Sequence, residues 1–177
     1  IVPSNIVSYF HQGWRLTRVG NASIGLTDIT TAGATNAFGP DIIGMSRPGG
    51  AGTNRSFLGY FDYGRRLNEI EQIKWNRFSN IGNDTYLNIF ITNSFGGFGV
   101  LGTTATVVVK PSITPGVWQE GVFDSSSTVD LRVGGTTYTL TWSELMSTYG
   151  NWFIYNDANI LANRQVGGIV FVSGSSS

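Results

Sequence analysis

Residues 85–92 (TYLNIFIT) and 103–110 (TTATVVVK) decide the fold class of this 177-residue chain. Both stretches are rich in Thr, Val, Ile, Tyr and Phe, which suit a pleated and half-buried backbone, and both have the length of strands. Between them, residues 95–102 (FGGFGVLG) are predicted to form a loop whose phenylalanines anchor it to the core. The two stretches therefore predict a β-rich chain.

The same pattern continues on both sides of this region. Apolar and polar residues alternate, or β-branched and aromatic residues dominate, in seven further segments. These segments are predicted strands at 14–18, 22–29, 56–62, 73–78, 129–133, 136–140 and 166–173. Gly134 and Gly135 separate two of them, which predicts a hairpin with a two-residue turn.

One helix is predicted over residues 142–149. Thr141 and Glu144 have the spacing of a capping box, in which the threonine hydroxyl accepts the amide of residue 144 and the glutamate reaches back. Apolar residues then recur at helical spacing, and Gly150 suits the position after the last turn.

These elements predict a single all-β domain over 1–177, an antiparallel β-sandwich with one short helix near 142–149. Residues 31–54 are rich in Gly, Ala and Pro and are predicted to form a long loop excursion, while 173–177 resemble a linker. The alternating segment 1–10 is predicted to pair as a strand, either within its own sheet or by exchange with a neighbouring copy.

Composition excludes several classes of function. Charged residues make up 12% of the chain, with 11 basic and 11 acidic residues, and form no basic patch along the sequence, so nucleic acid is not an expected partner. The absence of cysteine excludes disulfides, thiolate metal sites and cysteine nucleophiles. No apolar run is long enough to span a bilayer. Small neutral polar residues supply most of the polarity, and we expect an extracellular location or a place on a cell or virion surface.

Several motifs follow one another in a distinctive order. They are 64–75 (GRRLNEIEQIKW), 87–91 (LNIFI), 115–119 (PGVWQ), the Thr-Trp-x-x-Leu of 141–145, and 167–172 (GGIVFV). This order resembles a group of secreted microbial proteins of uncharacterised function, although Arg66 stands where that group has proline. The resemblance implies a concanavalin A-like or laminin-G-like jelly roll and export, and it supplies no catalytic residues.

Residues 68–78 (NEIEQIKWNRF) present the one catalytic alternative, a degenerate jelly-roll glycoside hydrolase. Such enzymes carry a strand similar to E-I-D-x-x-E, whose outer glutamates are nucleophile and acid/base. Glu69 and Glu71 match part of it, but Lys74 stands where the proton donor belongs, and an ammonium group does not easily replace a carboxylic acid. His11 is the sole histidine and has no nucleophile motif beside it. We therefore expect a turn and a strand here, and no enzyme.

A glycan platform needs an exposed aromatic ring beside amide and carboxylate groups, because a sugar stacks by its apolar face and is read through its hydroxyls. The segment 151–157 (NWFIYND) offers such residues. The two rings are three positions apart, so they share a face only if the segment turns; otherwise the tryptophan and Ile154 pack inward as a strand. The predicted glycan-binding residues are Trp152, Tyr155, Asn156, Asp157 and Asn159.

Oxygen-rich loops offer a candidate calcium site, and no other cofactor is expected. The predicted ligands are Asp157, Asn83 and Asp84, with ordinary turn formation as the alternative. Three N-glycosylation sequons begin at Asn21, Asn54 and Asn83.

Two functions fit these features. The first is an exported, non-enzymatic recognition or adhesion module whose edge loops bind a glycan or another surface polymer. The second is a self-assembling structural subunit of an extracellular filament, coat or viral shell, whose partners are copies of itself. Sparse charge and the alternating segment 1–10 fit the second function, but the first is the slightly preferred prediction and self-assembly is the alternative. Neither the ligand nor the oligomeric state follows from the sequence.

Overall fold

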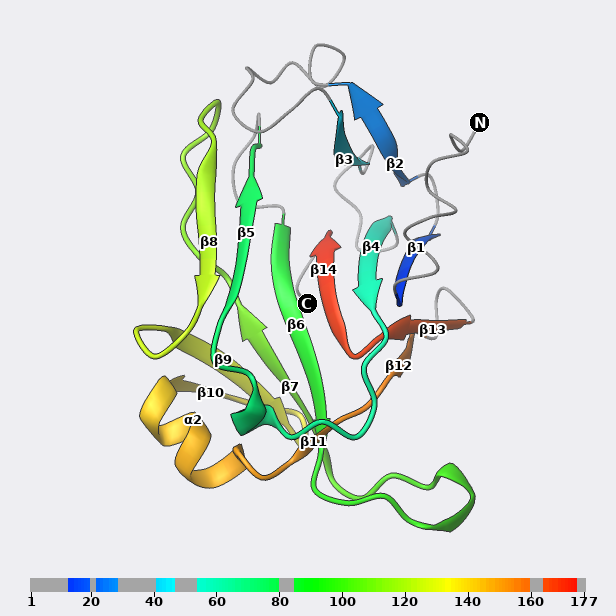
Figure 1. Cartoon of the computed structure of the whole chain (residues 1–177), viewed down its shortest axis with the longest axis vertical. Helices are drawn as coiled ribbons and strands as arrows, with labels where there is room; N and C mark the ends of the chain where they lie inside the picture. Colours follow the sequence, from blue (N-terminus) through cyan, green and yellow to red (C-terminus); the bar gives the residue numbers. More distant parts are fainter. Residues whose placement is uncertain are drawn as a thin grey trace.

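The computed structural model describes residues 13–19, 22–28, 41–46, 54–79, 85–159 and 164–174. Its main sheet runs in the order β1-β4-β14-β6-β7-β9-β10, and every pair of neighbours is antiparallel (Figure 1). The all-β, antiparallel prediction is therefore confirmed. In sheet order the strands are β1 (Trp14–Val19), β4 (Arg55–Tyr60), β14 (Ile169–Ser173), β6 (Thr85–Thr92), β7 (Thr104–Val109), β9 (Thr128–Val133) and β10 (Thr136–Thr141).

Strand β6 lies at the centre of the sheet, and six of its eight residues are buried. One of its edges is shared by two partners. Strand β14 pairs with its first part as far as Ile89, and the two-residue strand β11 (Phe153–Ile154) pairs with its end. Phe90 lies between the two pairings and bonds to both partner segments. Its N–H donates to Gly168 O, just before β14, at 2.9 Å, and its carbonyl accepts from Tyr155 N, just after β11, at 3.1 Å. This arrangement brings β11 to the point where β6 enters the loop toward β7.

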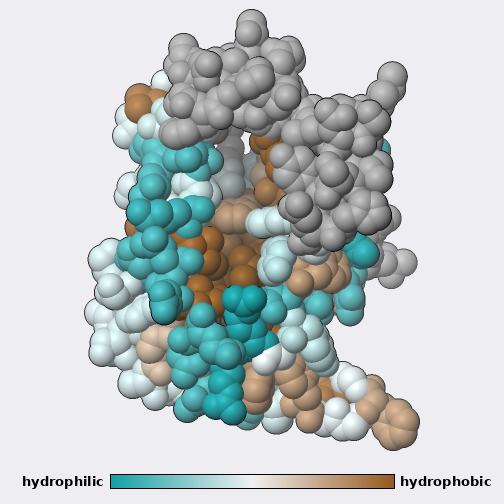
Figure 2. Space-filling model, viewed as in Figure 1, coloured by the Kyte–Doolittle hydropathy of each residue, from teal (hydrophilic) through white to brown (hydrophobic). Residues whose placement is uncertain are grey.

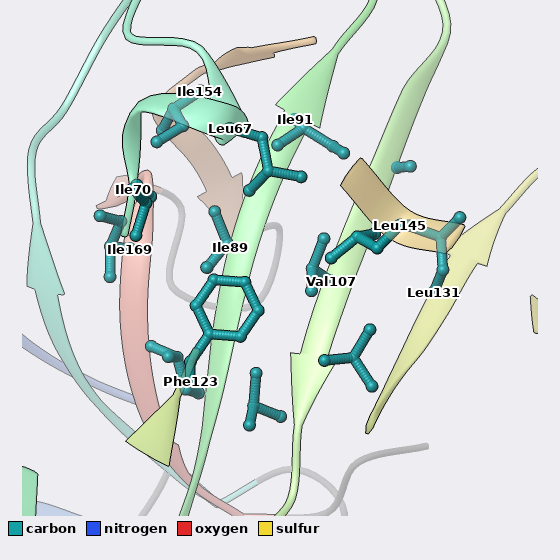
Figure 3. Packing of buried hydrophobic residues seen from close by; sticks show 14 of the residues in the cluster. Leu67, Ile70, Ile89, Ile91, Val107, Phe123, Leu131, Leu145, Ile154 and Ile169 are labelled. Atoms are coloured by element: carbon teal, nitrogen blue, oxygen red, sulfur yellow. The ribbon is translucent and has the colours of Figure 1, made fainter. Parts of the chain in front are cut away.

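A second layer covers one face of the sheet (Figures 1 and 3). It consists of the ribbon β5 (Ile73–Arg77)–β8 (Gln119–Phe123), the short 3-10 helix η1 (Leu67–Glu69) and helix α2 (Trp142–Tyr149). Figure 2 shows hydrophobic surface beside this ribbon. The buried core between the layers comprises Leu67, Ile70, Leu87, Ile89, Ile91, Ala105, Val107, Val109, Phe123, Val129, Leu131, Leu145, Ile154, Ile169 and Phe171.

The opposite face of the sheet buries hydrophobic residues too, because side chains alternate along each strand. The hairpin β12 (Asp157–Asn159)–β13 (Arg164–Gly167) packs on this face against β4, where a Cβ on Gly59 would collide with the Val166 carbonyl. The ribbon β2 (Ser23–Asp28)–β3 (Asp41–Ser46) contacts β1 and β4. The chain is thus β-rich and sandwich-like. This second cluster comprises Phe57, Tyr86, Phe90, Val108, Tyr155, Val166, Val170 and Val172.

The structure confirms the helix with its predicted ends. Thr141 Oγ1 accepts the Glu144 amide at 3.4 Å, and the Glu144 carboxylate accepts the Thr141 amide at 2.8 Å. These hydrogen bonds lower the pKa of Glu144, because they favour its charged form. At the other end, Gly150 N–H donates to Met146 O, and any larger residue there would collide with that carbonyl.

The predicted turn and strand over 68–78 are also confirmed. Glu69 belongs to η1, where its carboxylate accepts the Arg66 amide, and β5 follows. Lys74 is exposed and forms an ion pair with Glu120 at 3.4 Å, whereas the two flanking residues of the strand pack against the core. The glycine hairpin is confirmed at β9–β10, with positive φ at both turn residues.

Three sequence-based expectations need correction. The stretch 31–54 is not a loop throughout, because β3 lies within it and pairs with β2. Ser173 is a buried residue of β14 rather than the start of a linker. Within 95–102, Phe95 packs against other rings but Phe98 does not anchor the loop, because it is fully exposed. Segment 1–10 lies outside the described residues.

Candidate functional site

Residues 93–103 connect β6 to β7 and project away from the sheet (Figure 1). The two arms of this loop are held together by backbone hydrogen bonds from Gly96 N to Val100 O at 2.7 Å and from Gly102 N to Ser94 O at 3.0 Å. A single 3-10 turn, η2 (Gly97–Gly99), closes its end. Figure 2 shows hydrophobic residues at this outer end, and we call residues 97–100 the loop tip.

Side chains fix the base of the loop. The single proton of the buried Thr92 hydroxyl is shared between two acceptors, Ser94 O at 3.0 Å and Thr103 O at 3.2 Å. The side-chain Oδ1 of Asn93 accepts the backbone N–H of Thr103 at 2.9 Å. The backbone N–H of Asn93 donates to Thr103 O at 3.0 Å. The loop therefore leaves the sheet in a defined direction.

A row of stacked side chains lies beside this base. Tyr63 stacks on Phe95 with ring centroids 4.6 Å apart, and Phe95 contacts Phe153 at 5.4 Å. The Arg66 guanidinium lies 5.3 Å from the Phe153 centroid and donates to Asn151 Oδ1 at 3.2 Å. We call these five residues the aromatic row.

The backbone explains how distant segments meet in this row. Gly64 N donates to Ile154 O at 2.9 Å, and Ile154 N donates to Arg65 O at 2.7 Å. The segment before η1 therefore lies along β11, which itself lies along the end of β6. Arg66 and Phe153 face each other as a β-bridge, and this register places the guanidinium beside the ring.

The row combines an exposed ring with hydrogen-bonding groups. Tyr63 is 58% exposed although one face of its ring is covered by Phe95. Arg66 and Asn151 are exposed, and the Asp62–Arg65 ion pair, at 2.8 Å, flanks the tyrosine in sequence. Such a surface offers an apolar stacking plane together with donors and acceptors for hydroxyl groups.

The structure does not bring the predicted glycan-binding rings together. Trp152 is half-buried against the core under α2, with its ring edge-on to Tyr149 at 4.9 Å. Tyr155 is 7% exposed and packs against Phe90 on the opposite face of the main sheet. The two rings thus belong to different hydrophobic clusters and share no exposed surface.

The polar members of that prediction have structural partners. Asn156 Oδ1 accepts the Asp62 amide at 3.1 Å. Asp157 accepts hydrogen bonds from the Ala158 amide and the Tyr155 hydroxyl, and burial raises its pKa by disfavouring the charged carboxylate. Burial, followed by the nearby Asp157 charge, also raises the pKa of Tyr155. Asn159 is the last residue of β12, and its side chain lies outside the described part.

The calcium and sequon predictions fall largely on residues that are not described. This is so for Asn83, Asp84 and Asn21, whereas Asn54 is half-buried directly before β4. Within the described ranges, no three His, Asp or Glu side chains group as they would around a metal ion. Both predictions stay open.

The catalytic alternative has little geometric basis within the described segments. Glu69 caps a 3-10 turn, Glu71 lies in the loop after it, and Lys74 bonds to Glu120. The two glutamates therefore do not lie on one strand as a nucleophile and acid pair would. His11 lies outside the described residues.

No protein-family model, curated protein or solved structure shows a significant match to this chain. The resemblance to secreted microbial β-sandwich proteins accordingly stays a prediction. Among the described residues, no helix has the length and apolar character needed to cross a membrane.

Proposed function

We propose that this chain is a non-enzymatic recognition module that binds a glycan, or a polymer of similar chemistry, on the aromatic row. The observation that carries the proposal is the Tyr63 ring, which is 58% exposed while its other side is supported by Phe95. A ring held in this way loses little conformational entropy when a ligand stacks on it.

Polar groups around the ring supply the second requirement of sugar recognition. The Arg66 guanidinium and the Asn151 amide are fixed by their mutual hydrogen bond, and Asn68 Nδ2 also donates to Asn151 Oδ1 at 3.3 Å. These exposed groups still have donors to offer to hydroxyls. Apolar stacking plus fixed donors is the combination that selects sugars over purely apolar ligands.

A glycan array followed by affinity measurement tests the proposal. The Tyr63→Ala substitution is expected to weaken binding at least ten-fold, about 1.4 kcal/mol. Tyr138→Ala is the matched control, because Tyr138 is 49% exposed on β10 and makes no contact with the row. Equal loss in both variants, or no binding of wild type to any glycan, would refute the proposal.

We also infer that the sandwich-like fold is a jelly roll of the concanavalin A-like kind and that the protein is exported. The two-layer core and the motif order over 64–175 support this inference. A crystal structure that completes the connections around β2 and β3 tests the topology, and fractionation of the source cells tests the location.

A second candidate function, self-assembly, is favoured by one observation. Strand β10 is the last strand in the sheet order, five of its six residues are exposed, and its sequence TTYTLT carries no charge or proline to block pairing. Such an edge accepts an added strand, for example segment 1–10 of another copy. Light scattering over a concentration range, with calcium and with chelator, checks this: growth that Thr139→Pro abolishes supports assembly, whereas a monomer throughout contradicts it.

A further inference from the structure

The loop tip carries the two most exposed large hydrophobic side chains of the described surface. Phe98 has a relative exposure of 110% and Val100 of 63%, at the end of a loop that projects from the sheet (Figures 1 and 2). Isolated exposed hydrophobics are common, but a fully exposed phenylalanine at the end of a projection is not explained by packing.

The hydrogen bonds of the loop prevent it from folding back to bury the Phe98 side chain. The bonds from Gly96 N to Val100 O and from Gly102 N to Ser94 O close the two arms, and Thr92 fixes the base. Phe98 has φ 59° and ψ 30°, the only positive φ among the described non-glycine residues. A bulky side chain in the left-handed region indicates a backbone that is held there, and such positions gather at functional sites.

The chemistry along the loop changes with distance from the sheet. The tip is apolar, and residues 93–103 contain no charged residue. At the base lies Tyr63, an amphipathic ring, and next to it Arg66, whose guanidinium interacts with the neutral Phe153 ring and Asn151 carbonyl. An apolar tip, with an amphipathic ring and a cation beside the base of its loop, matches the chemistry of a lipid surface, in which acyl chains lie below anionic headgroups.

Size distinguishes a lipid surface from a protein partner. A stable protein interface buries about 800 Å² on each partner, with roughly 20–30 residues a side. The tip offers two fully or largely exposed apolar side chains, Phe98 and Val100. Insertion into the headgroup boundary has no such minimum area, because its strength scales with the apolar area buried and with the attraction to anionic lipids, so two side chains give a weak attachment.

We propose that the loop tip inserts into the headgroup–acyl boundary of a lipid surface, with Phe98 and Val100 as the inserted side chains and Arg66 facing anionic headgroups. This goes beyond glycan recognition, because the inserted side chains, Phe98 and Val100, are not members of the aromatic row. Two inserted side chains give weak, reversible attachment that several copies on one surface would strengthen.

Flotation with vesicles tests the insertion. Phosphatidylcholine vesicles with and without phosphatidylserine carry no glycan, so the outcome is independent of the proposed function. Wild type is expected to float with the vesicles, more so with phosphatidylserine, and Phe98→Asn/Val100→Ser is expected to bind at least ten-fold more weakly. Val117→Ser is the matched control, because Val117 is 50% exposed on another loop.

Fluorescence of a Phe98→Trp variant measures insertion directly. The introduced indole is expected to shift to the blue and to be quenched by brominated lipid when vesicles are added, relative to wild type with its five tryptophans. Absence of vesicle binding by wild type, equal binding by the double variant, or an unshifted spectrum overturns the proposal. A concentration-dependent dimer that the double variant abolishes would assign the tip to a second copy and overturn it as well.

Discussion

The Trp75 indole lies directly over Gly121 in the neighbouring strand, so closely that a Cβ at residue 121 would come within 2.6 Å of Trp75 Nε1 and overlap the ring. The same indole contacts Phe171 of the main sheet, with ring centroids 5.3 Å apart. Trp75 thus connects the β5–β8 ribbon to the sheet, and the glycine makes room for it.

Gly121→Ala is therefore expected to destabilise the protein by about 1–3 kcal/mol, the usual cost of overpacking a buried contact. Urea denaturation measures this change. Gly97→Ala is the matched control, because a Cβ there meets nothing within 4 Å. Two variants of equal stability would show that the indole does not lie over Gly121.

The cap of α2 gives a second prediction. Removal of the Thr141 hydroxyl in Thr141→Ala leaves the Glu144 amide without its acceptor, and the expected loss is about 0.5–2 kcal/mol. Ser143→Ala in the same turn is the control, because Ser143 is exposed and does not cap the helix. A loss no larger than that of the control would contradict the cap.

The half-buried carboxyl of Asp157 predicts a pH dependence. Burial raises the pKa of Asp157 in the folded state above its value in the unfolded chain. The contribution of this carboxyl to the free energy of unfolding is therefore largest at pH values below the unfolded pKa, and it is lost as pH rises through the folded pKa. Relative to Asp157→Asn, wild type should lose stability as pH rises above about 4, the ordinary pKa of an aspartate. Urea denaturation at several pH values measures the difference.

Asp124 serves as the control for this prediction, because the sign is reversed there. The Ser126 hydroxyl and amide lower the pKa of Asp124. The contribution of Asp124 to the free energy of unfolding is present above its unfolded pKa and is lost as pH falls through its folded pKa. Wild type should therefore gain stability relative to Asp124→Asn as pH rises. If both variants show the same pH dependence, the burial of Asp157 does not govern its ionisation.

Phe98 predicts a stabilising substitution. A non-glycine residue in the left-handed region costs roughly 1–2 kcal/mol, and asparagine tolerates that region better than phenylalanine. Phe98→Asn is therefore expected to be at least as stable as wild type, whereas Phe98→Val should be less stable. An unstable asparagine variant would mean that the phenylalanine supports the fold instead of a ligand.

Local signals sufficed for much of the fold. The helix and the glycine hairpin depend on residues at most a few positions apart, so their signatures are visible in the sequence. Strand β3 has no clear local signal, because Asp41–Ser46 contains aspartate, glycine and serine, which are uncommon in strands. The strand forms through its pairing with β2, which a local pattern does not reveal.

The candidate site depends on contacts that no local pattern contains. The aromatic row joins Tyr63 to residues 95 and 153, and their meeting requires β11 to take over from β14 beside β6. The sequence singled out the segment 151–157, with Trp152 and Tyr155 as its rings, whereas Asn151 and Phe153 belong to the row. Strand alternation separates Trp152 from Asn151 and Phe153. Tyr155 leaves the row for another reason: β11 ends at Ile154, and Tyr155 packs against Phe90 on the opposite face of the main sheet.

The most direct test of the account is an amide NMR titration of the ¹⁵N-labelled protein with the best glycan from the array. Perturbed amides are expected to cluster at residues 63–66, 93–96 and 151–153, which contain or adjoin the aromatic row. Perturbations centred on β10, or none with any glycan of the array, would contradict recognition at Tyr63.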